Sequence, residues 1–359
     1  MFDTGLWLIK IMESNKHNKS FDVTKKEYKK IWLSYDEQYS LLYQRGMSFE
    51  NYSKDKALRK LEFIGYYRLS GYSHAFRCSP SDEKFIEGTK FKDIIELYKF
   101  DRKLKLLLLD AIERIEVAVR ACLAYQLSNV SVSFIDSDSN FELDRIVTNN
   151  NNRRKNKKTG GVSDTLKVKN VLHDLREKIS EKINSSSRKN EPAIEHLIST
   201  YKEPYPLWIT IQIFDFSDLC NLYQIISPDL AKNVSNKFGV VSPAIFLSWL
   251  QSIRVVRNIC AHHGRLVNRN LRVLPKIPNV KEAYKWLALW KSAEFIDKTK
   301  IFSIICILHH ILNNIQASKS WDNRIVQLLN EFPKIDIEKF DSVKKVLGCP
   351  EGWENIGNY

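Results

Sequence analysis

The stretch that decides the fold is FKDIIELYKFDRKLKLLLLDAIERIEVAVRACLAYQL, residues 91–127, which contains neither glycine nor proline. Its apolar side chains recur at steps of three, four or seven, the spacing that places them on one face of an α-helix. Glu113, Glu116 and Arg120 lie off this face. The stretch therefore predicts one long helix whose buried stripe consists of Leu97, Phe100, Leu104, Leu108, Ile115 and Cys122.

Shorter helical patterns lie on both sides of this stretch. A first helix is expected at about residues 36–46, and residues 54–77 form an aromatic-rich helical pattern that Gly71 is expected to break. Residues 207–226 again have a helical pattern, and Pro243 is expected to start a further helix. Because the 359 residues include only 12 glycines and 10 prolines, helices can run without interruption, and an all-α protein is predicted.

The composition divides the chain into three parts. Residues 1–34 are polar and lysine-rich, and residues 35–275 carry the main helical domain. Residues 276–359 form a helical extension that is rich in tryptophan. We therefore expect one helical domain with additional segments at both ends.

The helical pattern is lost at about residues 128–192, which we interpret as a variable insertion in the main domain. Its segment NNNNRRKNKK, residues 149–158, has five basic side chains and no carboxylate. The segment is either a solvated surface loop or a basic arm that binds phosphates. In the second case, the candidate RNA-binding residues are Arg153, Arg154 and Lys155.

The charge of the chain indicates its class of partner. A net charge of +14 and an isoelectric point near 9.3 create a field that attracts polyanions, with nucleic acid as the leading partner. An anionic membrane would require a basic amphipathic helix or a lipidation signal, and no convincing example is found. The apolar run at residues 301–312 is shorter than the ~20 residues that span a bilayer, and no secretory signal is recognised. We expect a cytoplasmic protein without a membrane partner.

The six cysteines are scattered along the chain. They form no C-x-x-C pair, and no nearby histidine completes a four-ligand cluster, so neither a zinc site nor a disulfide framework is predicted. Glycine-rich phosphate loops of the G-x-x-x-x-G-K or G-x-G-x-x-G type are also missing from the sequence. We therefore expect no metal and no cofactor.

Residues 230–281 contain no aspartate or glutamate but nine lysines and arginines. A surface patch that serves only solubility usually mixes both signs of charge, so this stretch favours a site for a polyanion. The candidates for contacts with RNA phosphates in this stretch are Arg254, Arg265, Arg269 and Arg272.

The helix expected from Pro243 has two different faces. At 100° per residue, its apolar face consists of Phe246, Trp249, Ile253, Val256 and Cys260. The opposite face consists of Arg254, Asn258, Ala261, His262 and Arg265. Arg257 lies at the boundary, about 140° from His262. These two side chains reach one phosphate only if the helix bends near Gly264 or if a second copy of the chain completes the site.

An arginine, an asparagine and a histidine without carboxylates suit RNA cleavage that needs no metal ion. A histidine can move protons to and from the 2′-hydroxyl or the leaving 5′-oxygen near neutral pH, and an arginine can stabilise the charge that develops on the phosphate. The product of this reaction is a 2′,3′-cyclic phosphate. Arg257 and His262 alone form only the pattern R-x-x-x-x-H, which is common by chance, so the surrounding sequence has to support it.

The surrounding residues, SIRVVRNICAHHGRLVNR at 252–269, resemble the signature of the Abi-like (abortive infection) family, AbiD/AbiF type. This family is a branch of the HEPN superfamily, in which R-N-x-x-x-H is the catalytic motif. The similarity continues through IGYYRLSGY at residues 64–72, through YKFDRKLKLLLLDAIERIEVAVR at residues 98–120, and through PLW and the helix after it. It covers roughly residues 35–275.

The resemblance implies a HEPN-like helical bundle with additional N- and C-terminal helices, and a ribonuclease toxin of phage defence. In this family Arg257 would stabilise the phosphate, Asn258 would fix the geometry and His262 would be the general acid or base. The resemblance also implies RNA as the substrate and a homodimer in which two motifs face each other. His263, turned 100° from His262, is expected to pack or to cap the helix.

Other polar residues leave alternatives open. Glu116 and Arg120, at i,i+4 spacing, are expected to form a structural ion pair, or their helix faces the active-site helix and orients Arg257. His309 and His310, in an apolar helix without a carboxylate nearby, are expected to be buried structural residues rather than metal ligands. The alternative function is a non-catalytic RNA-binding module that holds a small noncoding RNA as a sensor or antitoxin.

Overall fold

The structure is a computed structural model that describes residues 31–79, 81–129, 173–178, 180–185, 192–203, 205–277, 297–340, 342–350 and 353. Within these residues the chain forms helices and two isolated β-bridges, Ser48 with Lys90 and Arg77 with Phe85, but no strand. The predicted all-α class is confirmed.

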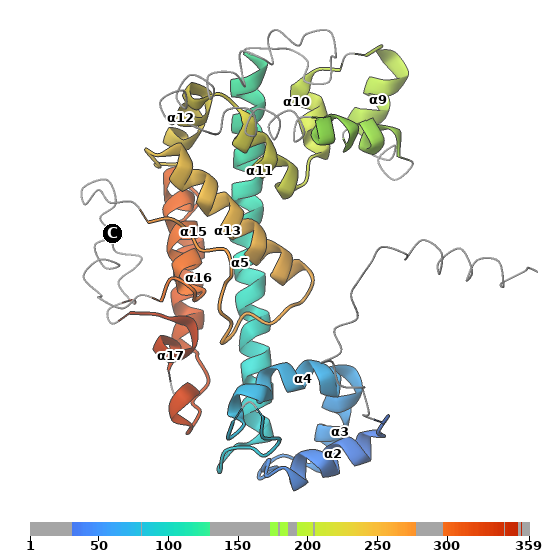
Figure 1. The fold of residues 1–359 in the computed structure, drawn as a ribbon, viewed down its shortest axis with the longest axis vertical. Helices are drawn as coiled ribbons and strands as arrows, with labels where there is room; N and C mark the ends of the chain where they lie inside the picture. The colour runs from blue at the N-terminus through green and yellow to red at the C-terminus, as the bar shows by residue number, and fades with distance from the viewer. Residues whose placement is uncertain are drawn as a thin grey trace, which may run out of the picture.

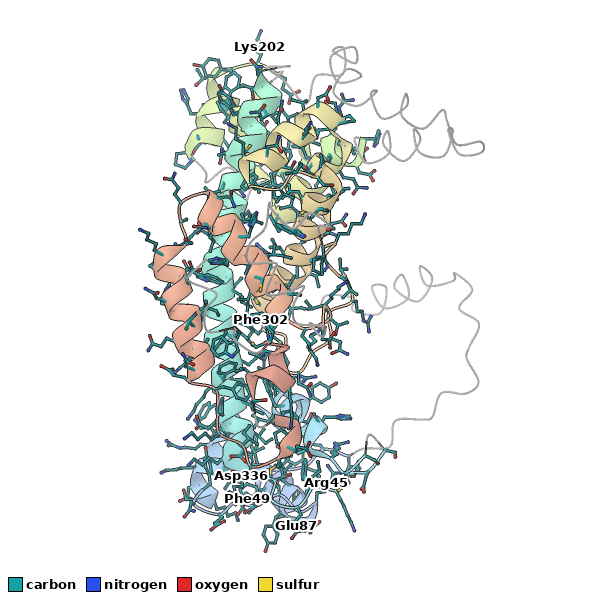
Figure 2. All side chains as sticks on the ribbon, turned by 90° about the vertical axis from the view of Figure 1, so that its left-hand side faces the viewer. Arg45, Phe49, Glu87, Lys202, Phe302 and Asp336 are labelled. Atoms are coloured by element: carbon teal, nitrogen blue, oxygen red, sulfur yellow. The ribbon has the colours of Figure 1, made fainter. Side chains whose placement is uncertain are left out.

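Helix α5 (Phe91–Ser128) is the spine of the molecule. Its 38 residues correspond to about 57 Å, and it runs through nearly the whole length of the fold in Figure 1. The prediction of one long helix is confirmed, and so is most of its buried stripe, except that Cys122 is only partly buried. Figure 2 shows how elongated the body is, with Lys202 at one end and, at the other, Arg45, Phe49, Glu87 and Asp336.

Three short helices pack around the N-terminal end of α5. They are α2 (Tyr35–Gln44), α3 (Lys54–Phe63) and α4 (Tyr66–Ser73), and α4 continues into the 3₁₀ turn η1 (His74–Phe76). The break predicted at Gly71 is wrong, because the chain turns at Gly65 and Gly71 lies inside α4. Gly65 has φ of 91°, a left-handed conformation that favours glycine, so the backbone can reverse there.

The opposite end of α5 is covered by a second group of helices. They are α9 (Pro192–Thr200), α10 (Leu207–Thr210), η2 (Ile211–Ile213), α11 (Phe216–Ile225) and α12 (Pro228–Lys237). The prediction of one helix over residues 207–226 is wrong, because the chain is extended at Phe214 and Asp215 and the next helix, α11, begins at Phe216. The Asp215 carboxylate accepts hydrogen bonds from the backbone N–H groups of Ser217 and Asp218, which caps α11.

Helix α13 (Pro243–Ala261) crosses α5, and the C-terminal helices lie along another side of the spine (Figure 1). These are α15 (Phe302–Asn314), α16 (Lys319–Asn330), η3 (Glu338–Phe340) and α17 (Val343–Leu347). The Trp321 indole donates a hydrogen bond to the Leu107 carbonyl (2.8 Å), and the apolar residues of α15 and α16 belong to the same core as those of α5. None of the described helices combines the length and the apolar composition needed to cross a bilayer.

The two histidines of α15 are buried, as predicted, with 3% exposure for His309 and 6% for His310. The expectation that no carboxylate lies nearby is wrong, since His309 Nδ1 is 2.8 Å from a carboxylate oxygen of Asp322 in α16. Asp322 follows His309 by 13 residues, and the turn between the two helices brings them together. Both histidines are therefore part of the core.

Candidate functional site

The two faces predicted for α13 are confirmed up to Ala261, where the helix ends, whereas Arg265, predicted on the polar face, lies beyond the helix. Its apolar face is at most 2% exposed and packs on the core through Phe246, Trp249, Ile253, Val256 and Cys260. On the opposite face Asn258, Ala261 and His262 are exposed, and Arg254 is partly buried. Arg257, at the boundary, is also partly buried. The amphipathic pattern thus leaves the polar residues of R-N-x-x-x-H at the surface.

Helix α13 ends at Ala261 in a tight turn. The His263 N–H donates to the Cys260 carbonyl (3.1 Å), and the Gly264 N–H donates to the Ile259 carbonyl (2.7 Å). These two bonds form a Schellman motif, which requires a left-handed residue at the position that His263 occupies. His263 has φ of 56°, although glycine usually fills this position. The helix therefore contains Arg257 and Asn258, and His262 is its C-cap residue.

The side chains of the three catalytic candidates have no polar partner within the described part of the chain. No hydrogen bond or ion pair from a described residue reaches the Arg257 guanidinium, the Asn258 amide or the His262 imidazole. Asn258 and His262 are four residues apart, and the His262 N–H donates to the Asn258 carbonyl (3.0 Å), so both side chains lie on one helix face. This arrangement leaves a cation, an amide and an imidazole free to bind a ligand at one end of α13.

The chain after α13 is fixed by residues of α4 and α5. Asp101 of α5 is fully buried, and one of its carboxylate oxygens accepts hydrogen bonds from the Leu266 N–H (2.9 Å) and the Val267 N–H (2.8 Å). Its other oxygen accepts a hydrogen bond from the Tyr72 hydroxyl (2.6 Å) and pairs with Lys105 Nζ (3.0 Å). Sequence reasoning missed Asp101, because its partners at 266 and 267 are backbone groups in a distant segment.

Lys105 and a further cation, Arg68, bind carbonyl groups of the same segment. Lys105 Nζ donates to the Gly264 carbonyl (3.1 Å), and Arg68 Nη1 donates to the His263 carbonyl (2.8 Å). Positive charge at this place is favourable, because the C-terminus of a helix carries the negative end of its dipole. Arg68 and Tyr72 both belong to the IGYYRLSGY segment, which therefore lies against the end of α13.

The four arginines proposed to bind RNA have different environments. Arg265 Nη1 donates to the carbonyl groups of Val267 (2.8 Å) and Asn268 (3.2 Å), so its side chain is turned back on its own loop and is a poor candidate for binding phosphate. Arg269 is exposed and makes one hydrogen bond, to the Arg265 carbonyl (3.3 Å). Arg272 is exposed and Arg254 is partly buried, and neither has a hydrogen bond within the described structure. Arg254, Arg269 and Arg272 remain candidates.

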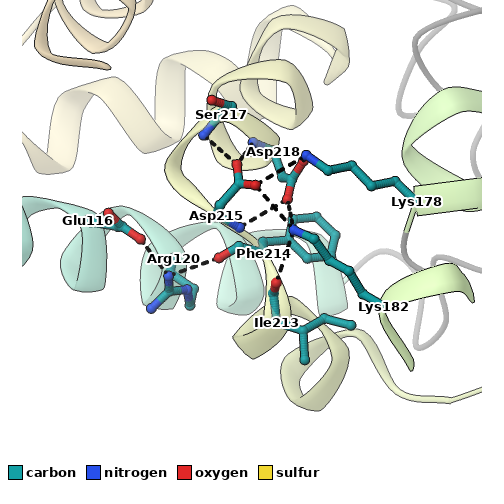
Figure 3. Close-up of polar contacts among 9 residues, drawn as sticks. All are labelled: Glu116, Arg120, Lys178, Lys182, Ile213, Phe214, Asp215, Ser217 and Asp218. Atoms are coloured by element: carbon teal, nitrogen blue, oxygen red, sulfur yellow. Dashed lines mark hydrogen bonds and ion pairs between the residues drawn. The ribbon is translucent and has the colours of Figure 1, made fainter. Parts of the chain in front are cut away.

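Glu116 and Arg120 form the expected ion pair, with 2.9 Å between Oε1 and Nη2 (Figure 3). Arg120 also donates to the Phe214 carbonyl (3.0 Å), so it ties α5 to the turn before α11. Neither side chain has a described contact with Arg257. The alternative in which this pair orients Arg257 receives no support from the described contacts.

The same view shows a charge cluster at the start of α11 (Figure 3). Lys178 and Lys182 each pair with Asp215 and Asp218 at distances between 2.5 and 3.2 Å. Burial tends to raise the pKa of Asp215, but the backbone N–H of Asp218 and the two lysines outweigh it and lower this pKa to about 2. The two lysines and the two aspartates neutralise each other's charge, so we interpret this cluster as a structural contact and not as a binding site.

Arg153, Arg154 and Lys155 lie outside the described residues. In the part of the chain that the structure describes, no group of three or more histidine, cysteine, aspartate or glutamate side chains is arranged to hold a metal ion.

Comparison with known proteins gives one match. The sequence model described as Abi-like protein matches residues 59–268, more than half of the chain, from α3 to the turn after α13. The match includes Arg68, Asp101, Arg257 and His262. No curated protein and no solved structure matches the chain significantly.

Proposed function

Since this chain belongs to the Abi-like protein family, we propose that it acts in abortive infection, a form of phage defence, as a metal-independent endoribonuclease. The proposal includes membership of the HEPN superfamily and of the AbiD/AbiF type. It rests on one observation above all, the exposed end of α13, where Arg257, Asn258 and His262 have no described polar partner. A site of this kind, in a stretch without acidic residues, fits an RNA phosphate.

The proposed reaction is attack of a 2′-hydroxyl on the adjacent phosphorus. The proton of the 2′-hydroxyl is removed by a base, a bond forms between the 2′-oxygen and phosphorus, and the bond from phosphorus to the 5′-oxygen breaks. The leaving 5′-oxygen takes up a proton, so the products are a 2′,3′-cyclic phosphate and a 5′-hydroxyl. His262 performs one of the two proton transfers, and Arg257 stabilises the additional negative charge on the phosphate oxygens.

A homodimer would complete this site. Arg257 and His262 project about 140° apart on an ideal helix, and His262 directly follows Ala261, the last residue of α13. A second copy of the chain, with its own α13 end facing the first, would supply another histidine for the second proton transfer. We therefore propose that the active form is a dimer whose two motifs share one RNA strand.

The test is cleavage of an RNA oligonucleotide by the purified full-length chain in the presence of EDTA. We expect wild type to cleave and to leave a 2′,3′-cyclic phosphate, and His262→Ala to cleave at least about 100-fold more slowly. Arg257→Ala is expected to have a similar defect. A matched control is His74→Ala, because His74 is also exposed but lies in η1, outside the R-N-x-x-x-H motif.

Two results would contradict the nuclease proposal. If His262→Ala cleaves as fast as wild type, the observed cleavage does not use this site. If wild type binds RNA without cleaving it and His262→Ala binds equally well, the chain is an RNA-binding module that holds its RNA intact. Substitution of 2′-deoxyribose at the cleavage position gives a further check, since it removes the attacking hydroxyl and should stop the reaction.

A further inference from the structure

Four residues outside the R-N-x-x-x-H motif hold the chain that follows it. We infer that Asp101, Lys105, Tyr72 and Arg68, together called the Asp101 brace, position His262 for catalysis. This inference rests on the proposed function, because it assigns these residues to the same site. They are positioning residues, since their contacts reach the chain after His262 and leave the imidazole itself free.

The brace binds the backbone immediately after His262. Two carbonyl groups, those of His263 and Gly264, accept hydrogen bonds from Arg68 and Lys105 at 2.8 and 3.1 Å. Two N–H groups, at residues 266 and 267, donate to Asp101 at 2.9 and 2.8 Å. Four backbone groups within five residues are thus fixed by side chains from α4 and α5. The turn has little freedom to move.

Members of the Asp101 brace also contact one another. Asp101 is fully buried, and its contacts with Tyr72 (2.6 Å) and Lys105 (3.0 Å) leave both carboxylate oxygens with two partners each. Burial, together with the negative charge of Asp101, raises the pKa of Tyr72, so its hydroxyl remains a hydrogen-bond donor. A buried ion pair usually stabilises a fold no more than packed apolar residues of similar volume would, because removing the charges from water costs free energy. The definite consequence of this network is the geometry of the turn.

That geometry is one the backbone would not adopt easily alone. His263 is left-handed, with φ of 56°, a conformation that is unfavourable for a residue with a side chain. Such conformations persist where surrounding contacts over-determine them. Because His262 immediately precedes this residue, the direction of its side chain depends on the turn being held in this form.

Arg257 does not depend on the brace in the same way. It lies more than one turn before the end of α13, in regular helix. Its neighbours Val256 and Cys260 are 0% and 2% exposed and anchor that part of the helix in the core. Weakening the brace should therefore misplace the proton-transfer group and leave the phosphate-binding arginine where it is. The expected signature is a slower chemical step with unchanged RNA affinity.

The experiment compares single-turnover cleavage with binding of an RNA that is 2′-O-methylated throughout and cannot be cleaved. Arg68→Ala and Tyr72→Phe are the informative variants, because Arg68 is exposed and Tyr72→Phe removes only a hydroxyl. We expect cleavage to slow about 10- to 100-fold, while the Kd for the methylated RNA stays within about twofold of wild type. Arg68→Lys, which can still donate to the His263 carbonyl, should recover part of the rate.

A matched control is Arg59→Ala, since Arg59 is an exposed arginine of α3 that takes no part in the brace. It should cleave as wild type does. The inference is overturned if wild type cleaves and both folded brace variants cleave equally fast, or if their affinity falls as much as their rate. A wild type that does not cleave at all would instead overturn the proposed function, so the two failures are distinguishable.

Discussion

Two pairs of adjacent histidines lie in this chain, one at the end of α13 (residues 262–263) and one within α15 (residues 309–310). The first pair is exposed, and its imidazoles have no described polar partner. In the second pair, His309 contacts Asp322 (2.8 Å) and His310 contacts the Gly239 carbonyl (3.1 Å). The same dipeptide thus serves as a candidate catalytic site in one place and as part of the core in the other.

The difference shows what decides the role of a polar residue in this fold. A buried imidazole needs a hydrogen-bond partner, because desolvation without one costs free energy, and both histidines of α15 have such a partner. An exposed imidazole at a helix end already has water and is free to exchange it for a ligand. Substitutions in the two regions should therefore affect different properties, stability in α15 and chemistry in α13.

The largest stability effect is expected from protonation of His310. Burial, opposed by the Gly239 carbonyl, lowers the pKa of His310 to about 4, whereas the unfolded chain titrates near 6.5. Because the unfolded state binds this proton first, the stabilising contribution is complete above pH 6.5 and is lost as the pH falls towards 4. Between pH 7 and pH 4 this loss amounts to about 3 kcal/mol of the free energy of unfolding.

The environment of His310 accounts for this direction. Within the part of the chain that the structure describes, its neighbours include the Trp249 ring (centroids 5.6 Å apart), Asn314 (3.3 Å), the Phe238 and Gly239 backbone and His309, none of which is a carboxylate. Urea unfolding at both pH values measures the effect, and His310→Gln, which cannot titrate in this range, should lose this part of the pH dependence. An unchanged pH dependence in His310→Gln would refute the assignment. His262→Ala should keep the full dependence.

A somewhat smaller effect is expected from Asp322→Ala. This substitution leaves the His309 imidazole without its partner inside the core, which should lower the free energy of unfolding by about 2 kcal/mol. His262→Ala, at the surface, should change it by less than about 0.5 kcal/mol. Both are measured by urea unfolding at pH 7, and equal losses in the two variants would remove the distinction between the pairs.

A smaller change than that of Asp322→Ala, and of opposite sign, is expected from His263→Gly. His263 is left-handed, so glycine should relieve backbone strain and raise the free energy of unfolding by about 1 kcal/mol, less the entropy that glycine adds to the unfolded chain. RNA cleavage should persist, because His263 has no proposed role in proton transfer. Thermal unfolding and the cleavage assay together check this, and a stability loss would mean that the His263 side chain makes a contact that matters.

The fold was predictable where local periodicity decides it. Residues 91–127 and the helix from Pro243 have long apolar stripes. The first helix forms within one residue of its expected bounds, and the second begins at Pro243 as expected but ends at Ala261, before Arg265. The breaks were less predictable. Gly65 and Gly71 look alike in the sequence, and only the path of the chain decides which of them takes the left-handed conformation. Likewise, the break in the predicted helix 207–226 depends on the Asp215 side chain, which caps the start of α11.

In the candidate site, too, some features follow from the sequence and others only from the tertiary structure. The polar face of α13 follows from the 3.6-residue period, so the sequence alone determines that Arg257, Asn258 and His262 lie near one end of one helix and off its buried face. The backbone groups that bind Asp101 are 165 and 166 residues away, and no local pattern in the sequence predicts them. Only packing of α4, α5 and α13 brings that carboxylate to the turn after His262. Periodicity records which face is buried, whereas contacts between distant segments depend on how the helices are placed in space.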